Sequence, residues 1–169
     1  VRGGARGKVG GVTNSDLFRD PEAERLVDAV SDRVGAQLAD EVDRHVHELV
    51  AFRRHLHAEP EPSGMERETT LSLLERLTLA GMSPRRLGVG TGLVCDLGPS
   101  GGPLVALRAD IDALAMHDAK TVSYASRVSG VAHACGHDVH TAIVLGAALV
   151  LRRLLPQLGA AVGVRFIFE

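Results

Sequence analysis

Apolar residues recur every three or four positions along a long N-terminal stretch of the chain. They are Leu26, Val27, Val30, Val34, Leu38, Val42, Val46, Leu49 and Val50. This spacing predicts one long amphipathic helix that buries a single apolar stripe. Asp20 and Pro21 suit the start of this helix. Gly35 is a candidate break within it, and Pro60 and Pro62 end it.

Shorter apolar patterns follow this helix. Helical spacing recurs over residues 66–79 and 142–155, and short runs typical of strands cover residues 89–97, 104–107 and 162–168. Gly81 suits the C-terminal cap of the first of these helices, and Pro156 is expected to end the second. The second helix has no polar face before Arg152, so we expect it to be buried against a sheet.

The alternation of strands and helices predicts an α/β fold, a mixed β-sheet flanked by helices on both faces. The turn over residues 99–103 predicts a hairpin-like link between its neighbouring strands. Residues 162–168 are apolar and terminal, so we expect an exposed, aggregation-prone edge strand. Residues 1–20 contain too few apolar positions to fold and are predicted to be a disordered tail, which leaves residues 21–169 as one domain.

Composition narrows the classes of partner. The net charge is −2, the sequence pI is about 6.5, and the aromatic residues are only four Phe and one Tyr. These values argue against nucleic acid or an anionic membrane as the main partner. No apolar run reaches the roughly 18 residues needed to span a bilayer, and no apolar segment typical of a secretory signal follows the basic N-terminus.

The two cysteines are predicted to differ in role. Cys95 and Cys135 lie far apart in the sequence, so we expect no disulfide scaffold and a cytoplasmic location. Cys95 shares a strand face with Leu93 and Leu97, which predicts a buried, small hydrophobic residue.

The densest chemistry of the chain lies in residues 133–140, which hold three of its eight His and one of its two Cys. Thiolate, imidazole and carboxylate groups are the ligands of first-row metals. Cys135 and His137 would point to opposite sides of a helix, but they can converge on the irregular backbone that Gly136 permits. We therefore predict that both bind a divalent metal ion, in a loop that enters the helix over 142–155. The alternative is a polar loop with scattered His and a free thiol.

Further candidate side chains lie at the ends of two elements. Asp110 and Asp112 follow the buried strand over residues 104–107, so both can face one crevice at its carboxyl end. An ion pair between Arg108 and one of these carboxylates is the structural alternative. His55 and His57 lie two residues apart at a helix end, which predicts surface or capping groups rather than ligands.

Four stretches, in order, resemble the N-acyl-amino-acid amidohydrolases, a metallopeptidase family that includes hippurate hydrolases and indole-acetyl-amino-acid hydrolases. They are residues 53–63, 88–92, 107–114 and 133–142. The resemblance implies the N-terminal portion of a zinc-exopeptidase-like catalytic domain. It also implies that Cys135 and His137 are ligands of a two-metal centre, that Asp110 is the carboxylate that orients this centre, and that His133 and His140 are not ligands.

The same resemblance implies a metal-dependent hydrolase that uses Zn²⁺, Mn²⁺ or Ni²⁺ and acts on small-molecule N-acyl amino acids. A homo-oligomer is compatible with this resemblance. Ala115 and Asp118 depart from the Pro and Glu usual in the family, which bears on substrate preference. The paired Glu and the later His ligands of the family would lie beyond Glu169. We therefore expect a domain that is incomplete at its C-terminus, with a frayed Glu169 and no activity by itself. The alternatives are a non-catalytic fragment, a half that needs a partner chain, and a redox-sensing thiol module at Cys135.

Overall fold

The computed structural model describes residues 21–88, 90–159 and 162–169, and the predicted tail over residues 1–20 lies outside this range. The chain divides after Gln37 into two units. The sheet and the buried apolar residues lie in the second unit, residues 38–169.

The helices of the described residues are α1 (Pro21–Ala58), α2 (Arg67–Leu79) and α3 (His137–Leu158). Gly35 does not interrupt α1, which ends before Pro60 as predicted. Helix α3 begins at His137 rather than near residue 142, because the amides of Val139 and His140 both bond to the Gly136 carbonyl and close a first turn inside the His-rich stretch. Pro156 lies within the last turns of α3 and does not end the helix.

The strands β1 (Arg85–Arg86), β2 (Leu93–Leu97), β3 (Leu104–Ala109) and β4 (Gly163–Phe168) form one sheet in the order β1-β2-β4-β3. Strand β4 pairs antiparallel with β2 and parallel with β3, which confirms the predicted mixed sheet. Because β4 separates β2 from β3, the expected hairpin-like link is wrong. The expectation that β4 is an exposed edge is also wrong, since β4 lies between β2 and β3 and most of its residues are buried, whereas β1 and β3 are the edge strands.

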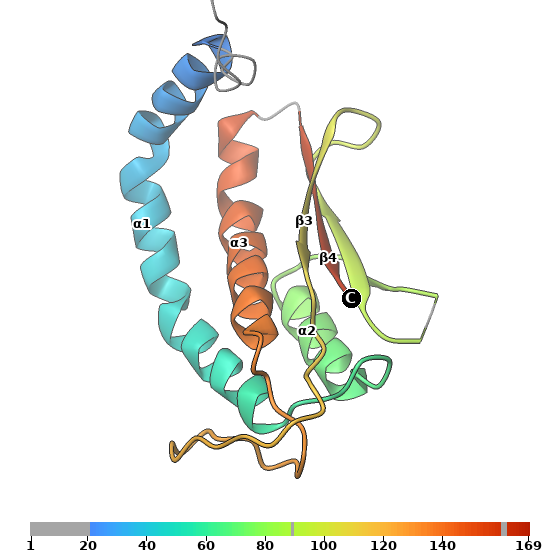
Figure 1. Cartoon of the computed structure of the whole chain (residues 1–169). Helices are drawn as coiled ribbons and strands as arrows, with labels where there is room; N and C mark the ends of the chain where they lie inside the picture. Colours follow the sequence, from blue (N-terminus) through green and yellow to red (C-terminus); the bar gives the residue numbers. More distant parts are fainter. Residues whose placement is uncertain (1–20, 89, 160–161) are drawn as a thin grey trace, which may run out of the picture. The chain divides into compact units, whose positions relative to one another are not determined.

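The core lies between the sheet and a layer of helices (Figure 1). Its members include Phe52 and Leu56 of α1, Leu73 and Leu77 of α2, Leu145 and Leu149 of α3, and Leu93, Cys95, Phe166 and Phe168 of the sheet. Cys95 is fully buried among them, as predicted. By length and composition α3 could cross a membrane, contrary to the expectation from sequence, but more than half of that segment is buried here and it forms part of the core. Each fully buried Leu or Phe contributes roughly 1.5–3 kcal/mol of apolar burial.

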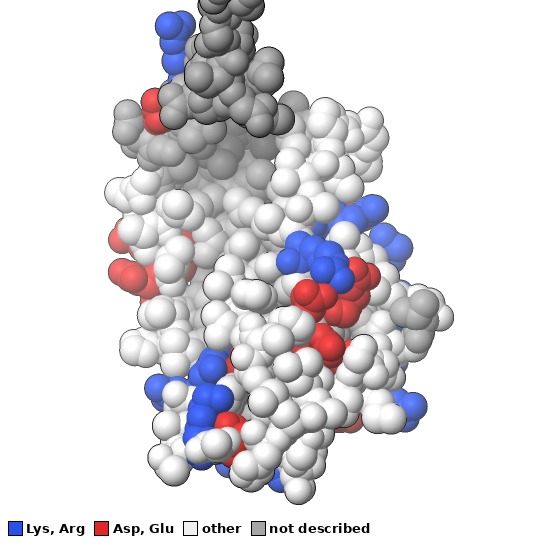
Figure 2. Space-filling view, viewed as in Figure 1, with Lys and Arg blue, Asp and Glu red and all other residues white. Residues whose placement is uncertain are grey.

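The opposite face of the sheet carries charged side chains. Arg165 of β4 donates to both carboxylate oxygens of Asp96 on β2, at 2.6 and 2.8 Å, which lowers the pKa of the Asp96 carboxyl. Figure 2 likewise shows basic and acidic groups side by side rather than one large patch of a single sign. Within residues 38–169, no described helix covers this face, so the expectation of helices on both faces is met on one face only.

Glu169 is held by the sheet rather than frayed. Its amide donates to the Ala109 carbonyl at 3.1 Å, and its carbonyl accepts the Ile111 amide at 2.9 Å. Its carboxylate also accepts a hydrogen bond from Arg108. The parallel pairing of β3 and β4 therefore continues through Glu169.

A buried polar network joins the end of α1 to the start of α3. The His57 ring is 1% exposed, and its Nδ1 lies 2.6 Å from Oδ2 of Asp138, a carboxylate with no exposed surface. Arg53 Nε lies 2.8 Å from the same oxygen, as an ion pair. The prediction that His57 is a surface or capping group is therefore wrong, whereas His55 is exposed as expected.

We expect His57→Ala to lower the free energy of unfolding by about 2–4 kcal/mol, because it removes a hydrogen bond to a buried charge. Urea denaturation followed by circular dichroism measures this loss. The matched control is His55→Ala in the same helix turn, which should change stability by less than about 0.5 kcal/mol. Equal losses in the two variants would contradict the role of the network.

We expect this chain to self-associate through the unpaired edge of β3, where Leu104 is 46% and Val105 is 52% exposed. A lysine on an edge strand opposes pairing with a second strand, so Val105→Lys should reduce the apparent mass at high concentration in multi-angle light scattering. Leu79→Lys adds the same charge at an exposed helix end and should leave the association unchanged. A wild-type chain that stays monomeric at high concentration would rule this expectation out.

Candidate metal centre

Two segments that are distant in sequence form the predicted metal centre. Residues 110–112 follow β3, and residues 133–138 lead into α3. Asp112 and His137 meet where these segments touch, at the carboxyl end of a parallel strand and the N-terminus of a helix. This is the position in an open α/β sheet at which sites gather.

The His137 ring is oriented by Asp112. Its Nδ1 lies 2.8 Å from Asp112 Oδ1 and 3.1 Å from the Asp112 carbonyl oxygen. Both partners accept hydrogen bonds, so the neutral ring carries its hydrogen on Nδ1. The Nε2 lone pair is then available, as in a metal-binding histidine held by a carboxylate.

Asp110 makes different contacts. Its carboxylate lies 2.8 Å from the Arg108 guanidinium, the ion pair that the sequence offered as the structural alternative. Asp110 Oδ2 is 4.0 Å from His137 Nε2, and its carbonyl accepts the Thr141 hydroxyl at 3.1 Å. The carboxylate in hydrogen-bond contact with His137 is thus Asp112, and the orienting role of Asp110 stays a prediction.

Cys135 lies just before the helix, with an exposed side chain and a free thiol. Gly136 separates it from His137 and adopts a φ of +82° at the N-cap of α3. That left-handed conformation is readily available to glycine, and it turns the chain between the thiol and the imidazole. Among residues 21–88, 90–159 and 162–169, no group of three or more His, Cys, Asp or Glu side chains is placed to hold a metal ion. A thiol and an available imidazole nitrogen suit a divalent transition metal, so the described residues fit part of a metal-binding set.

A further buried imidazole, that of His133, lies two residues before Cys135 in the chain. His133 is 4% exposed, and neither of its ring nitrogens has a hydrogen-bond partner among the described residues. Burial lowers the pKa of His133, so its ring stays neutral at pH 7. Its ring centroid lies 6.4 Å from that of His57, which extends the buried polar network toward the residues that precede Cys135.

The loop that departs from the family pattern is anchored by Asp118. Its carboxylate accepts the amides of Ser126 and Lys120 at 2.9 and 3.1 Å. These bonds, the Ser126 bond foremost, lower the pKa of Asp118 to about 2. Asp118 Oδ2 also lies 3.5 Å from His57 Nε2, so the substituted position joins the buried network.

Sequence reasoning did not find the roles of Asp112, Asp138 and His57. The only local signal for Asp138 was a carboxylate directly after His137. No local signal marked His57, whose partner lies 81 positions away in the chain.

Comparison with known proteins gives consistent matches. The model of peptidase family M20/M25/M40 matches residues 106–169. N-acetyl-L-cysteine deacetylase of Bacillus subtilis is 47% identical over 106 residues, which are 62% of this chain and 26% of that protein. N-acyl-L-amino acid amidohydrolase of Geobacillus stearothermophilus is 40% identical over 134 residues, which are 79% of this chain and 35% of that protein.

A solved structure agrees with these relatives. A Bacillus subtilis protein described as a dinuclear metal-binding peptidase of the M20 family superposes with a TM-score of 0.67 and 38% identity, over 72% of this chain and 34% of that one. The chain therefore spans between 26% and 35% of the length of these three proteins. The shared motifs, the matched relatives and the common fold together show that this chain is similar to proteins of peptidase family M20/M25/M40, whose model matches residues 106–169.

Proposed function

We propose that this chain forms the metal-binding end of a metal-dependent amidohydrolase that acts on N-acyl amino acids. The observation that carries the proposal is the His137 ring, which Asp112 holds with Nε2 available, two residues after Cys135, whose free thiol is exposed. The substrate class is supported by the two relatives, which are named for N-acetyl-L-cysteine and for N-acyl-L-amino acids.

In this proposal Cys135 and His137 hold a divalent ion of the kind Zn²⁺, Mn²⁺ or Ni²⁺. Thiolate and imidazole donors favour zinc among these ions. A bound ion polarises an amide carbonyl and makes hydroxide available near neutral pH. Asp112 keeps the hydrogen of the imidazole on Nδ1, which raises the basicity of Nε2. The second ion of a two-metal centre requires ligands beyond these two side chains.

Amide hydrolysis also needs a carboxylate that moves a proton to the leaving amine. Asp112 is hydrogen-bonded to His137, and Asp110 and Glu169 both contact Arg108. Each of these three carboxylates is therefore already engaged with another side chain, so none is free to act as this proton carrier. We therefore infer that residues 1–169 do not turn over substrate alone, which keeps a non-catalytic fragment, or a half that needs a partner chain, as the second candidate.

We also propose the partners and the cellular location of this protein. Small-molecule substrates fit the family, and a homo-oligomer is compatible with the exposed edge of β3. Two cysteines that both remain free support a cytoplasmic location.

Zinc titration calorimetry on the 169-residue chain tests the ligand assignment. We expect weak binding, because two protein ligands fall short of the three usual at a catalytic zinc. Cys135→Ala and His137→Ala should each abolish the binding, and Asp112→Asn should weaken it about 10- to 100-fold. His117→Ala, which removes an exposed imidazole elsewhere, is the control and should bind like wild type. Equal binding by wild type and Cys135→Ala would refute the role of Cys135.

A hydrolysis assay tests the reaction. With added Mn²⁺ or Zn²⁺, hippurate and N-acetyl amino acids should not be turned over detectably by the 169 residues, since loss of a positioned acid–base group alone costs about 10²- to 10⁴-fold in rate. A chain extended to the length of the relatives should be active, and Cys135→Ala in that chain should be inactive. Turnover by the 169 residues that a chelator abolishes and metal restores would overturn the inference that they are inactive alone.

A further inference from the structure

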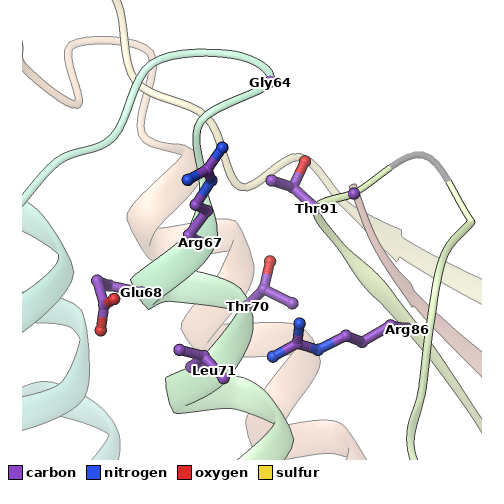
Figure 3. A pocket seen from close by; sticks show the side chains of 8 residues that line it. Gly64, Arg67, Glu68, Thr70, Leu71, Arg86 and Thr91 are labelled. Carbon is purple, nitrogen blue, oxygen red and sulfur yellow. The ribbon is translucent and has the colours of Figure 1, made fainter.

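A cavity beside α2 has two arginines in its wall. It has a volume of about 470 Å³ and is lined by Arg67, Thr70, Arg86, Gly90 and Thr91, among others (Figure 3). We propose that this cavity binds a small oxyanion, the carboxylate or phosphate group of a small molecule. This site is separate from the proposed metal centre, because none of its lining residues belongs to that centre.

The two guanidinium groups are not neutralised within the protein. Among the described residues, neither the Arg67 nor the Arg86 side chain lies within 4.0 Å of a carboxylate oxygen. In contrast, the guanidinium group of Arg85, the residue just before Arg86, lies 3.4 Å from the Asp96 carboxylate. The guanidinium group of Arg76 in α2 lies 2.6 Å from the Glu48 carboxylate. Arg76 and Arg85, which lie outside the cavity, are thus paired with carboxylates. Arg67 and Arg86, which line the cavity, have no such partner, so their positive charge faces the cavity.

One acidic residue, Glu68, also lines the cavity, so the lining carries two positive charges and one negative charge. Figure 3 shows the Glu68 carboxylate on the far side of α2 from Arg86, pointing away from the space between α2 and the loop. Glu61 accepts the amides of Arg67, Glu68 and Thr69 at 3.0, 3.0 and 2.8 Å. The first turn of α2 is therefore already capped by a protein carboxylate, and the anion would be held by the two side chains rather than by the helix N-terminus.

The wall opposite α2 is fixed in place. The Gly92 amide donates to the Thr70 hydroxyl at 2.8 Å, and Thr70 itself donates to the Glu66 carbonyl, which ties the loop over residues 90–92 to α2. Gly92 has a φ of +78°, and a Cβ there would lie 2.5 Å from the Phe168 carbonyl oxygen. Only glycine fits this close approach to β4, so the cavity is held open before any ligand arrives.

The chemistry of the wall selects the ligand. A guanidinium group binds carboxylate or phosphate oxygens through two parallel N–H donors. Arg67 comes from α2 and Arg86 from β1, and both side chains extend toward the cavity (Figure 3). The Thr91 hydroxyl has no partner among the described residues and can donate a further hydrogen bond. A volume of about 470 Å³ admits a small organic molecule that carries the anionic group.

The test is an NMR titration of the full 169-residue chain, labelled with ¹⁵N, with inorganic phosphate and separately with acetate at constant ionic strength. We expect saturable shifts of the Gly64, Gly90 and Thr91 amides. Arg67→Gln and Arg86→Gln should each weaken binding about tenfold or more, and the double variant should abolish it. Both arginines are exposed, so the variants should keep the wild-type circular dichroism spectrum.

Arg85→Gln is the matched control, because it removes the same charge one residue away but outside the cavity. It should titrate like wild type. If only phosphate saturates the shifts, the ligand carries a phosphate group. If only acetate does, it carries a carboxylate group. If both do, the site accepts either group. Shifts that do not saturate, or that are equally weakened by Arg85→Gln, would mean general charge screening and would overturn the proposal.

Discussion

The structure depends most directly on one buried carboxylate, that of Asp138. It has no exposed surface, and a carboxylate removed from water is tolerated only when it is paired and hydrogen-bonded. His57 and Arg53 of α1 satisfy one of its oxygens, and the Val139 amide satisfies the other at 3.0 Å. Because Asp138 lies in the first turn of α3, this network fixes the start of α3 against the end of α1. It thereby also sets the position of His137, the residue directly before Asp138.

The parallel pairing of β3 and β4 determines which charges meet at the edge of the sheet. The two strands end together, so Asp110, Asp112 and Glu169 lie at one edge. The three carboxylates have two partners: Asp112 contacts the His137 ring, while Asp110 and Glu169 share Arg108. Arg108 thus neutralises carboxylates that would otherwise repel one another at close range. Among the described residues, these three carboxylates at the edge are therefore all in contact with a basic side chain or an imidazole.

The proposed anion cavity and the proposed metal centre depend on the same end of the sheet. Gly92 brings the loop that walls the cavity against the backbone of Phe168, at the end of β4. Ala113, just after Asp112, donates its amide to the Glu61 carbonyl, while the Glu61 carboxylate caps α2. The helix beside the cavity is therefore connected through Glu61 to the segment that carries Asp112.

The sequence by itself determined the elements and much of the chemistry. Apolar spacing predicted α1, α2 and the strands that became β2, β3 and β4, and alternation along one strand predicted the burial of Cys95. These features follow from periodicity, which is a local property of the chain. The residues around Cys135 and His137 likewise carried the family resemblance, because their spacing is local.

Tertiary structure decided what depends on contacts between distant segments. It placed β4 in the centre of the sheet, buried His57 against Asp138, and assigned the orientation of His137 to Asp112. It also started α3 five residues early, since Gly136 closes the first turn within the His-rich stretch. Hydrogen bonds between residues 25 and 81 positions apart leave no periodic pattern in the sequence. Only the folded chain, by excluding water from these groups and forcing them to pair, determines which polar residues meet.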